Sequence, residues 1–141
     1  MSTKTLQGNF SFTLPAEFGH QDVTQEVAQF VSKSGIGTGI AVLQLVGSTG
    51  AITTIESEPG ALADLRRALD ALAPVDAHYE HNARWGDGNG FSHVRSALLK
   101  TSISIPIVGG QLALGTWQQI VVINFDNRPR SRDLTVVVIG E

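Results

Sequence analysis

The chain contains no cysteine, so it has neither disulfide bonds nor thiolate ligands for a metal ion. Its 141 residues are enough for one domain that buries roughly two-thirds of its unfolded surface, and a core of that size needs no covalent cross-link. Any metal ion would be held by histidine, aspartate, glutamate or backbone oxygen. The absence of cysteine also fits a cytoplasmic protein.

Positive charge is scarce as well. Ten Lys and Arg residues stand against thirteen Asp and Glu, and the net charge of −3 excludes the basic stripe that nucleic-acid binders place against phosphate. No apolar run reaches the length of a membrane span, and the first residues lack the apolar core of a signal peptide. We therefore expect a soluble, cytoplasmic protein with no nucleic-acid or membrane partner, which binds a small molecule or another protein.

The hydrophobic pattern predicts a single α+β domain over residues 1–141, built on antiparallel sheet. Helices are predicted over 22–34, over 59–72 and, more briefly, after Asn89, because apolar residues recur there at helical spacing. The segment 47–50 is predicted to close a hairpin, and Gly109-Gly110 a second one. Strands are predicted where apolar residues alternate or run together, over 5–14, 40–46, 51–56, 103–108, 111–114, 118–125 and 134–139.

The segment from His81 to His93 is the densest group of reactive side chains. Within thirteen residues it carries two imidazoles, the carboxylate of Asp87, the carboxamide of Asn89 and three glycines. Each of these polar groups would need its own partner in a core, so the segment is interpreted as a site. Asn89 is predicted to cap a helix whose first turn brings His93 near Asp87. The alternative is a polar loop whose histidines only form hydrogen bonds.

His81, His93 and Asp87 have the side chains that hold a divalent ion such as Zn²⁺ or Mg²⁺, and the same groups serve in acid-base catalysis. Asp87 could bind the ion directly or orient an imidazole, and its other interpretation is a turn before Gly88. Glu56, at the end of a predicted strand, is a candidate general base. Its alternative role is a charge in the first turn of the next helix.

Several residues are candidates for binding substrate. Ser48 and Thr49 could hold a phosphate with adjacent backbone N–H groups, although ordinary turn chemistry explains them as well. Gln118 could contact a ligand, and so could Asn89. Arg130 lies between Arg128 and Arg132, and this alternation would place guanidinium groups on one side of an extended chain, as a phosphate clamp requires. A solvated turn is the alternative.

Five short motifs are spread over nearly the whole chain. They are Gly47-Ser-Thr-Gly-Ala-Ile-Thr-Thr-Ile-Glu56, Tyr79-x-His81, Asp87-x-Asn89-x-x-x-His93, Leu114-Gly-Thr-Trp-Gln118 and Asp126-x-x-Pro129-Arg130. Together these motifs resemble the secondary thiamine-phosphate synthase (YjbQ-like) family. The resemblance implies a two-sheet β-sandwich, a homotrimer, and a secondary activity that joins a pyrimidine diphosphate to a thiazole phosphate with loss of pyrophosphate. The physiological substrate stays open.

One departure from the family affects the expected chemistry. Many members carry a histidine in the motif where this chain has Gly47-Ser48-Thr49, so a third imidazole is absent here. His78 or Glu56 could take its place in a metal site. Two functions follow as hypotheses: an enzyme that uses a divalent ion to neutralise a pyrophosphate leaving group, or a non-catalytic trimer that binds a phosphorylated small molecule.

A trimer also has some support in the strand sequences. The segments 103–107 and 121–125 are more continuously apolar than a strand with one solvent-exposed face would tolerate. Both faces of these strands are therefore expected to be covered, with neighbouring subunits supplying part of the cover. The resemblance, and not this pattern, selects three subunits.

Overall fold

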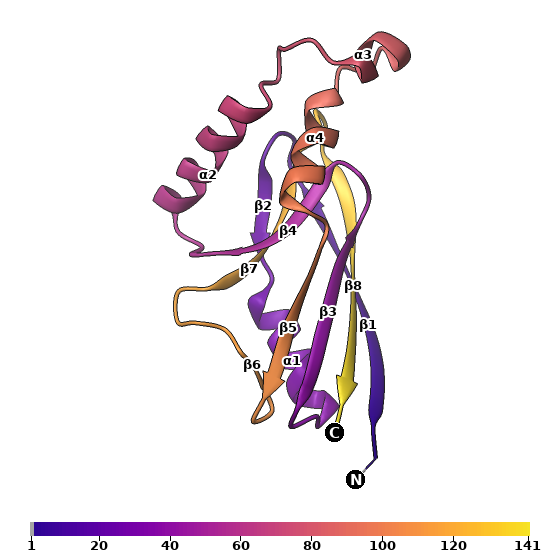
Figure 1. Cartoon of the computed structure of the whole chain (residues 1–141), viewed down its shortest axis with the longest axis vertical. Helices are drawn as coiled ribbons and strands as arrows, with labels where there is room; N and C mark the ends of the chain where they lie inside the picture. The colour runs from indigo at the N-terminus through magenta and orange to yellow at the C-terminus, as the bar shows by residue number, and fades with distance from the viewer. Residues whose placement is uncertain (1) are drawn as a thin grey trace.

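The computed structural model describes residues 2–141 and has two antiparallel sheets and four helices (Figure 1). The larger sheet has the strand order β1 (Lys4–Leu14), β8 (Arg130–Gly140), β3 (Gly39–Val46), β5 (Ser102–Val108) and β6 (Gln111–Leu112). The smaller sheet has the order β2 (Gly19–Asp22), β7 (Gln119–Asn124) and β4 (Gly50–Ile55). The helices are α1 (Thr24–Ser34), α2 (Pro59–Leu72), α3 (Glu80–Trp85) and α4 (Gly90–Leu99).

The main core lies between the two sheets and α1. Every second residue of β8 from Leu134 to Val138 is buried, as the alternation of its sequence predicts. These side chains pack with Ile120 and Val122 of β7 and with Val27 of α1 in one apolar cluster. The prediction of an α+β domain on antiparallel sheet is therefore confirmed, and the two sheets match the sandwich that the resemblance implied.

Strand β7, the central strand of the smaller sheet, is buried on both faces. Val121 and Ile123 of β7 point away from the main core and pack against Leu62 and Leu69 of α2. The continuous apolar run in β7 is thus covered within one chain, so the expectation that a neighbouring subunit is needed there is wrong. In residues 2–141, no helix is long and apolar enough to cross a membrane.

The segment 47–50 does not close a hairpin. β3 pairs with β5 and β8, whereas β4 pairs with β7 in the other sheet. Gly47 has a φ of 131°, a conformation that glycine adopts without strain, and there the chain crosses from one sheet to the other. Ala51 and Ile52 are both buried, which requires a strand covered on its two faces and not an exposed hairpin arm.

Two elements were not predicted, and one strand is longer than expected. The segment 80–85 is the short helix α3, which ends at Gly86 in the left-handed conformation, so the expected single loop before Asn89 is wrong in its first half. Strand β2 was also missed, because its sequence Gly-His-Gln-Asp has no apolar pattern. β8 begins at Arg130, inside the expected polar turn, because Arg130 and Arg132 find partners in the protein.

Candidate functional site

His81 and His93 lie face to face at the junction of α3 and α4. Their ring centroids are 4.3 Å apart and the ring planes are inclined by 40°. The two helices can approach this closely because the backbone N–H of Gly90 donates to Oδ1 of Asn82 at 2.8 Å. A Cβ at Gly90 would come within 2.6 Å of Tyr79, so a larger residue would push the helices apart. The structure thus brings the two predicted imidazoles into one cluster.

Asp87 lies beside this pair. Its Oδ1 is 3.3 Å from Nδ1 of His81, although the geometry is not that of a hydrogen bond, and Nδ1 has no hydrogen-bond partner among residues 2–141. The side chain of His81 is 31% exposed and that of Asp87 is 48% exposed, so solvent reaches both. Nδ1 itself is buried beside the carboxylate, so proton exchange between His81 and a bound molecule would use the other ring nitrogen, Nε2.

Asn89 occupies the N-cap position of α4 but does not cap it, so the predicted capping hydrogen bond is wrong. Its amide instead lies between two carboxylates. In one orientation Nδ2 donates to Oδ1 of Asp126 at 3.4 Å. With the amide turned over, the nitrogen lies 3.0 and 3.2 Å from the carboxylate oxygens of Asp87. Because the amide nitrogen can donate to either carboxylate, the side chain of Asn89 has a partner in both orientations and is held in place.

The pKa of His93 is lowered below 6.5. Burial of the ring is the main cause, and repulsion from a protonated His81 adds to it, whereas Asp126 and Asp87 act in the opposite direction. His93 is therefore neutral near pH 7 and can accept a proton or a hydrogen bond.

Behind the histidines, Asp126 is fully buried and surrounded by donors. Its carboxylate accepts from Thr49 Oγ1 at 3.1 Å, from the backbone N–H of Asn127 at 2.8 Å and from Arg130 Nε at 2.9 Å. Burial alone would raise the pKa of this carboxyl group. The hydrogen bonds from Asn127, Arg130, Asn89 and Thr49 outweigh burial and lower its pKa.

Arg132 completes this buried network. Its NH2 group donates to Thr49 Oγ1 at 2.6 Å and to Asn124 Oδ1 at 2.7 Å, and its Nε has no hydrogen-bond partner among the described residues. Burial lowers the pKa of Arg132, the positive charge of Arg130 lowers it further, and Asp126 opposes the change. A Cβ at Gly47 would lie 2.7 Å from the guanidinium, so only glycine leaves room for it.

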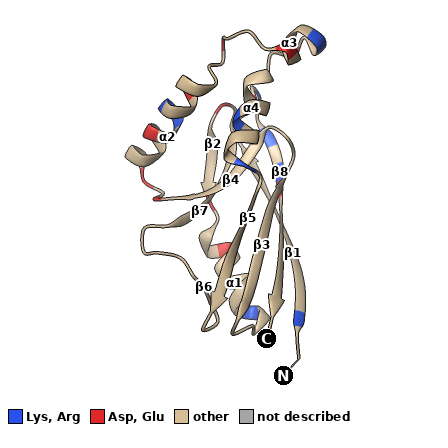
Figure 2. Cartoon of the chain, viewed as in Figure 1, with Lys and Arg blue, Asp and Glu red and all other residues tan. Residues whose placement is uncertain are grey.

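A cavity of about 380 Å³ opens beside His93. Ser48, Lys100 and Thr101 contribute to its wall, so the imidazole shares a solvent-accessible space with a cation and two hydroxyl-bearing residues. Lys100 follows the last residue of α4 with a positive φ of 81°, which non-glycine residues seldom adopt. Figure 2 shows basic residues on α4 and at the start of β8 at this end of the molecule.

Lys100 and Asp126 were not assigned a role from the sequence. Asp126 stood only in a motif and in a polar turn, and Lys100 was an ordinary lysine at a predicted helix end. The change from apolar helix to β-branched strand after Leu99 could have indicated a sharp turn at Lys100. No local pattern could have indicated that Asp126 is buried.

Glu56 and Gln118 are not part of this cluster. Both lie near the end of β4 that is remote from Thr49, roughly 16 Å away at the usual strand rise of about 3.3 Å per residue. Gln118 Nε2 donates to Thr54 Oγ1 at 3.1 Å, and its Oε1 accepts from the N–H of Gly115 at 3.0 Å. Glu56 is exposed after β4 and does not cap the next helix either, because Glu58 holds that position.

The other candidates divide between the cavity and the buried network. Ser48 lines the cavity, whereas Thr49 is buried and both of its hydrogen bonds go to Asp126 and Arg132. Arg130 is paired with Asp126 and is not in a solvated turn. His78, one of the two residues that could replace the absent third imidazole, is 76% exposed and lies 3.4 Å from Glu80, outside the pair of imidazoles.

A metal ion needs more ligands than this cluster supplies. Two imidazoles and a carboxylate are donor types that Zn²⁺ accepts. However, no three His, Asp or Glu side chains within residues 2–141 are arranged to hold an ion. The residues of one chain therefore do not fit a complete metal centre, and the chemistry proposed below contains no step through a metal.

A family model and several individual relatives all place the chain in the same protein family. The family model described as UPF0047 protein YjbQ-like matches residues 9–141. A UPF0047 protein of Methanothermobacter thermautotrophicus is 40% identical over 120 residues, which cover 85% of this chain and 82% of the relative. The UPF0047 protein YugU of Bacillus subtilis is 33% identical over 121 residues, covering 84% of this chain and 88% of the relative.

Solved structures share the whole fold. The crystal structure of a YbjQ-like protein of unknown function from Sulfolobus solfataricus P2 superposes with a TM-score of 0.94 at 29% identity, covering 99% of this chain and 100% of the other. A hypothetical protein from Aeropyrum pernix K1 gives a TM-score of 0.83 at 31% identity, covering 95% and 99%. The arrangement of sheets and helices is therefore common to these proteins.

Proposed function

The chain belongs to the YjbQ-like UPF0047 family, and from this premise we propose that it is an enzyme acting on a phosphorylated small molecule in the cavity beside His93. One observation carries the proposal. His93 shares the cavity wall with Lys100 and Ser48, and its ring also contacts His81, which lies next to Asp87. Groups suited to binding phosphate and groups suited to proton transfer thus lie next to each other, which supports the proposal.

The phosphate would be held by charge and hydrogen bonding. Lys100 supplies a positive charge at the cavity, and the hydroxyl groups of Ser48 and Thr101 can donate to phosphate oxygens. Arg130 and Arg132 are already bound to Asp126 and Thr49, so they contribute to the shape of the site and are not proposed as direct ligands. This replaces the arginine clamp of the sequence-based hypothesis with a lysine.

Proton transfer would fall to the two histidines. Neutral His93 can accept a hydrogen bond or a proton from the bound molecule, and the carboxylate of Asp87 lies beside the pair, 3.3 Å from Nδ1 of His81. Asn89, bound to one carboxylate or the other, fixes the loop that carries Asp87. The arrangement supplies positioning and acid-base groups and offers no activated nucleophile.

The family resemblance gives the reaction a specific form, thiamine-phosphate synthesis. In that reaction the bond between the pyrimidine methylene carbon and the pyrophosphate oxygen breaks, and pyrophosphate leaves with the electron pair. The thiazole nitrogen then forms the new bond to carbon. Lys100 would stabilise the charge on the departing pyrophosphate, and the N–H of the neutral His93 ring would donate a hydrogen bond to it.

The experiment is to incubate the protein with the pyrimidine diphosphate and the thiazole phosphate and to measure thiamine phosphate by chromatography. We expect product with the wild type, a loss of at least about 100-fold for His93→Gln, and no change for His78→Gln, since His78 lies outside the cluster. Equal rates for the two variants would contradict the proposal.

Pyrophosphate binding distinguishes the non-catalytic alternative. Stabilisation of the wild type by pyrophosphate in a thermal unfolding assay, lost in Lys100→Gln but kept in Lys33→Gln, would support the phosphate site. If this stabilisation is observed while no product forms, the protein is a binding module for a phosphorylated molecule. Lys33 is a suitable control because it lies in the last turn of α1, away from the cavity.

A divalent ion such as Zn²⁺ or Mg²⁺ is a separate proposal, for which the donor types of His81, His93 and Asp87 are the support. Elemental analysis of protein purified without chelator tests it. If these residues hold an ion, completed by ligands that one chain does not supply, metal is present in the wild type and lost in the double variant His81→Ala/His93→Ala. Equal metal content in the two proteins would remove these residues as ligands.

A further inference from the structure

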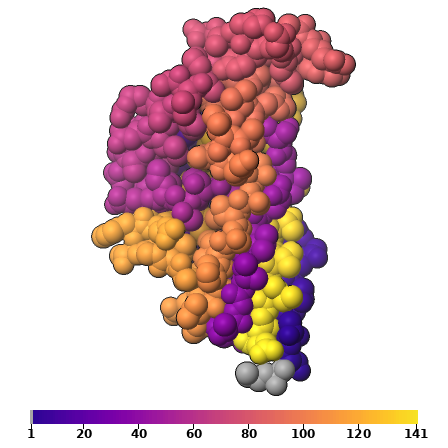
Figure 3. All heavy atoms as spheres, in the orientation of Figure 1, coloured from indigo at the N-terminus to yellow at the C-terminus, as the bar shows by residue number. Residues whose placement is uncertain are grey.

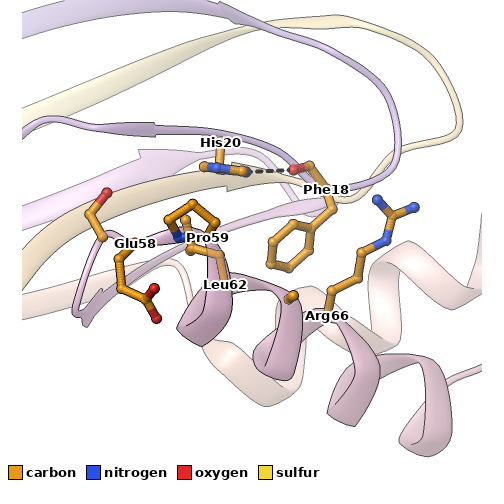
Figure 4. A pocket seen from close by; sticks show the side chains of 8 residues that line it. Phe18, His20, Glu58, Pro59, Leu62 and Arg66 are labelled. Carbon is orange, nitrogen blue, oxygen red and sulfur yellow. Dashed lines mark hydrogen bonds between the residues drawn. The ribbon is translucent and has the colours of Figure 1, made fainter.

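A second cavity, of about 510 Å³, lies between α2 and the chain around β2 (Figure 4). It is separate from the cavity at His93, and no residue lines both. Its wall is mainly apolar and carries a cation and an imidazole. The residues that define it are Phe18, His20, Pro59, Leu62, Ala63 and Arg66.

Phe18 forms a rigid floor. Its ring is buried and packs 6.2 Å from the ring of Phe125, measured between centroids. Glu17 and Phe18 both have positive φ, at 52° and 85°, which costs energy for residues with a side chain. Two backbone hydrogen bonds hold this strained turn. The N–H of Glu17 donates to the carbonyl oxygen of Asp126 at 2.9 Å, and the N–H of Phe18 donates to the carbonyl oxygen of Asn124 at 2.7 Å.

His20 presents one defined hydrogen-bonding group to this cavity. Its Nδ1 lies 2.9 Å from the carbonyl oxygen of Phe18, as the dashed line in Figure 4 shows. A carbonyl only accepts, so Nδ1 carries the hydrogen and Nε2 of the neutral ring is left as an acceptor. The imidazole also contacts the Phe18 ring edge-on, at 5.5 Å between centroids.

Arg66 is a cation without a partner. Its guanidinium carbon lies 5.9 Å from the centroid of the Phe18 ring, and the side chain has no ion pair or hydrogen bond within residues 2–141. Its neighbour Arg67, in contrast, is paired with Asp64 at 2.7 Å. The carboxylate of Glu58 lies at the opposite end of the cavity in Figure 4 and is occupied with the N–H groups at the start of α2.

We propose that this cavity binds a small aromatic carboxylate that carries a hydroxyl group. The aromatic ring would pack on Phe18, Pro59 and Leu62, because these residues supply the apolar wall. The carboxylate would pair with Arg66, whose charge is otherwise unused, and the hydroxyl group would donate to Nε2 of His20. The site is independent of the function proposed for the cavity at His93.

The test uses para-hydroxyphenylacetate as the probe and the full chain as the protein. Calorimetric titration is expected to give saturable binding with a Kd on the order of 0.1–1 mM, the range for a ligand of this size. The neutral probe para-hydroxyphenylacetamide is expected to bind about ten-fold more weakly, because it cannot pair with Arg66. Phenylacetate, without the hydroxyl group, is expected to bind about three-fold more weakly.

Matched variants locate the binding. Arg66→Gln should weaken the binding of para-hydroxyphenylacetate about ten-fold and leave the binding of the amide probe unchanged. Arg67→Gln should leave the binding of both probes unchanged. Ala63→Trp should abolish binding of both probes, because position 63 is at the exposed rim and an indole there fills the cavity without altering the core. Far-ultraviolet circular dichroism checks that each variant is folded.

Three results would overturn the proposal. The first is no saturable binding of para-hydroxyphenylacetate to the wild type. The second is equal losses for Arg66→Gln and Arg67→Gln, which would mean non-specific charge attraction. The third is undiminished binding to folded Ala63→Trp, which would place the ligand elsewhere.

Discussion

The guanidinium of Arg130 and the fully buried carboxylate of Asp126 form an ion pair, with NH2 and Oδ2 2.8 Å apart. Nε of Arg130 donates to the same oxygen at 2.9 Å. The pair joins the second residue after β7 to the first residue of β8, and Asp126 also accepts from Thr49 at the crossing between the sheets. This contact therefore holds in place the wall against which Asn89 and the histidines pack.

Replacing Asp126 with Asn should destabilise the protein by about 2–4 kcal/mol, because Arg130 and Arg132 would lose their nearby negative charge. Urea unfolding followed by circular dichroism measures this. Asp133→Asn is the control. Asp133 is an exposed carboxylate of β8 that only accepts from Ser11 Oγ, so its loss should cost less than about 0.5 kcal/mol. Equal losses of unfolding free energy in the two variants would show that the buried network contributes little to stability.

Arg130→Lys tests whether this arginine binds phosphate or supports the fold. A lysine keeps the charge but cannot make both the Nε hydrogen bond and the NH2 contact to Asp126, so we expect a loss of about 1 kcal/mol in unfolding free energy. Affinities for a phosphorylated ligand and its dephosphorylated form should fall by the same factor. A selective loss for the phosphorylated form would revive the arginine clamp.

The lowered pKa of Asp126 predicts a specific loss of stability in acid. Because the folded-state pKa lies below that of the unfolded chain, its contribution is fully present above the ordinary carboxyl pKa of about 3.9. It is lost as the pH falls through the lower folded-state value. The unfolding free energy of the wild type should therefore drop below about pH 4 more steeply than that of Asp126→Asn. Parallel curves for the two proteins would contradict this.

The pKa of His93 should respond in opposite directions to its two neighbours. Removing the charge of His81 with His81→Gln should raise the pKa of His93, and Asp87→Asn should lower it further. Nuclear magnetic resonance titration of the imidazole resonances measures both. A His93 pKa at or above 6.5 in the wild type, or no response to either change, would show that the rings are not packed as described.

We also expect a homotrimer. The outer face of the larger sheet is uncovered, as Figure 3 shows for β5, β3 and β8, and it carries exposed apolar side chains. Ile40 pairs across the strands with Ile139 and Pro106, and Val42 with Val137, so these side chains form one continuous patch. An apolar patch of this kind is typical of an interface. The resemblance to the family, not the patch, gives the number three.

Sedimentation measures this assembly. The wild type should sediment with three times the mass of one chain at micromolar concentration. Val42→Lys should shift the assembly toward the monomer, because burying an unpaired lysine charge in the interface costs free energy. Ser131→Lys is the matched control, because it lies on the same outer face at its polar end. A wild type that sediments as a stable monomer would refute the trimer.

Patterns within short segments were enough for most of the fold. Alternation along β1 and β8, the leucine stripe of α2 with Pro59 at its start, and the glycines between β5 and β6 are all local features, and each predicted its element correctly. The hairpin between β3 and β4 was wrong because a turn sequence shows that the chain reverses, but not which strand becomes the neighbour.

Only part of the candidate site could be predicted, because a short stretch of sequence does not show which distant segments become neighbours. His81, Asp87 and His93 are close in sequence, so one loop and one helical turn suffice to gather them. Glu56 and Gln118 were grouped with them by chemistry, but Glu56 follows the far end of β4, and Gln118, just before β7, lies beside that same end. Lys100 enters the cavity through a backbone conformation that its residue type does not indicate.

The sequence by itself determined most of the secondary structure and the pair of histidines, because those depend on spacings of a few residues that backbone geometry enforces. The tertiary structure decided which charges are buried and which are free. Thr49 meets Asp126 across 77 residues and Arg132 across 83, and these groups become a network only when the two sheets pack and exclude water. A polar residue in a turn and a polar residue in a buried network look alike in the sequence, since the difference lies in partners that only the packed fold supplies.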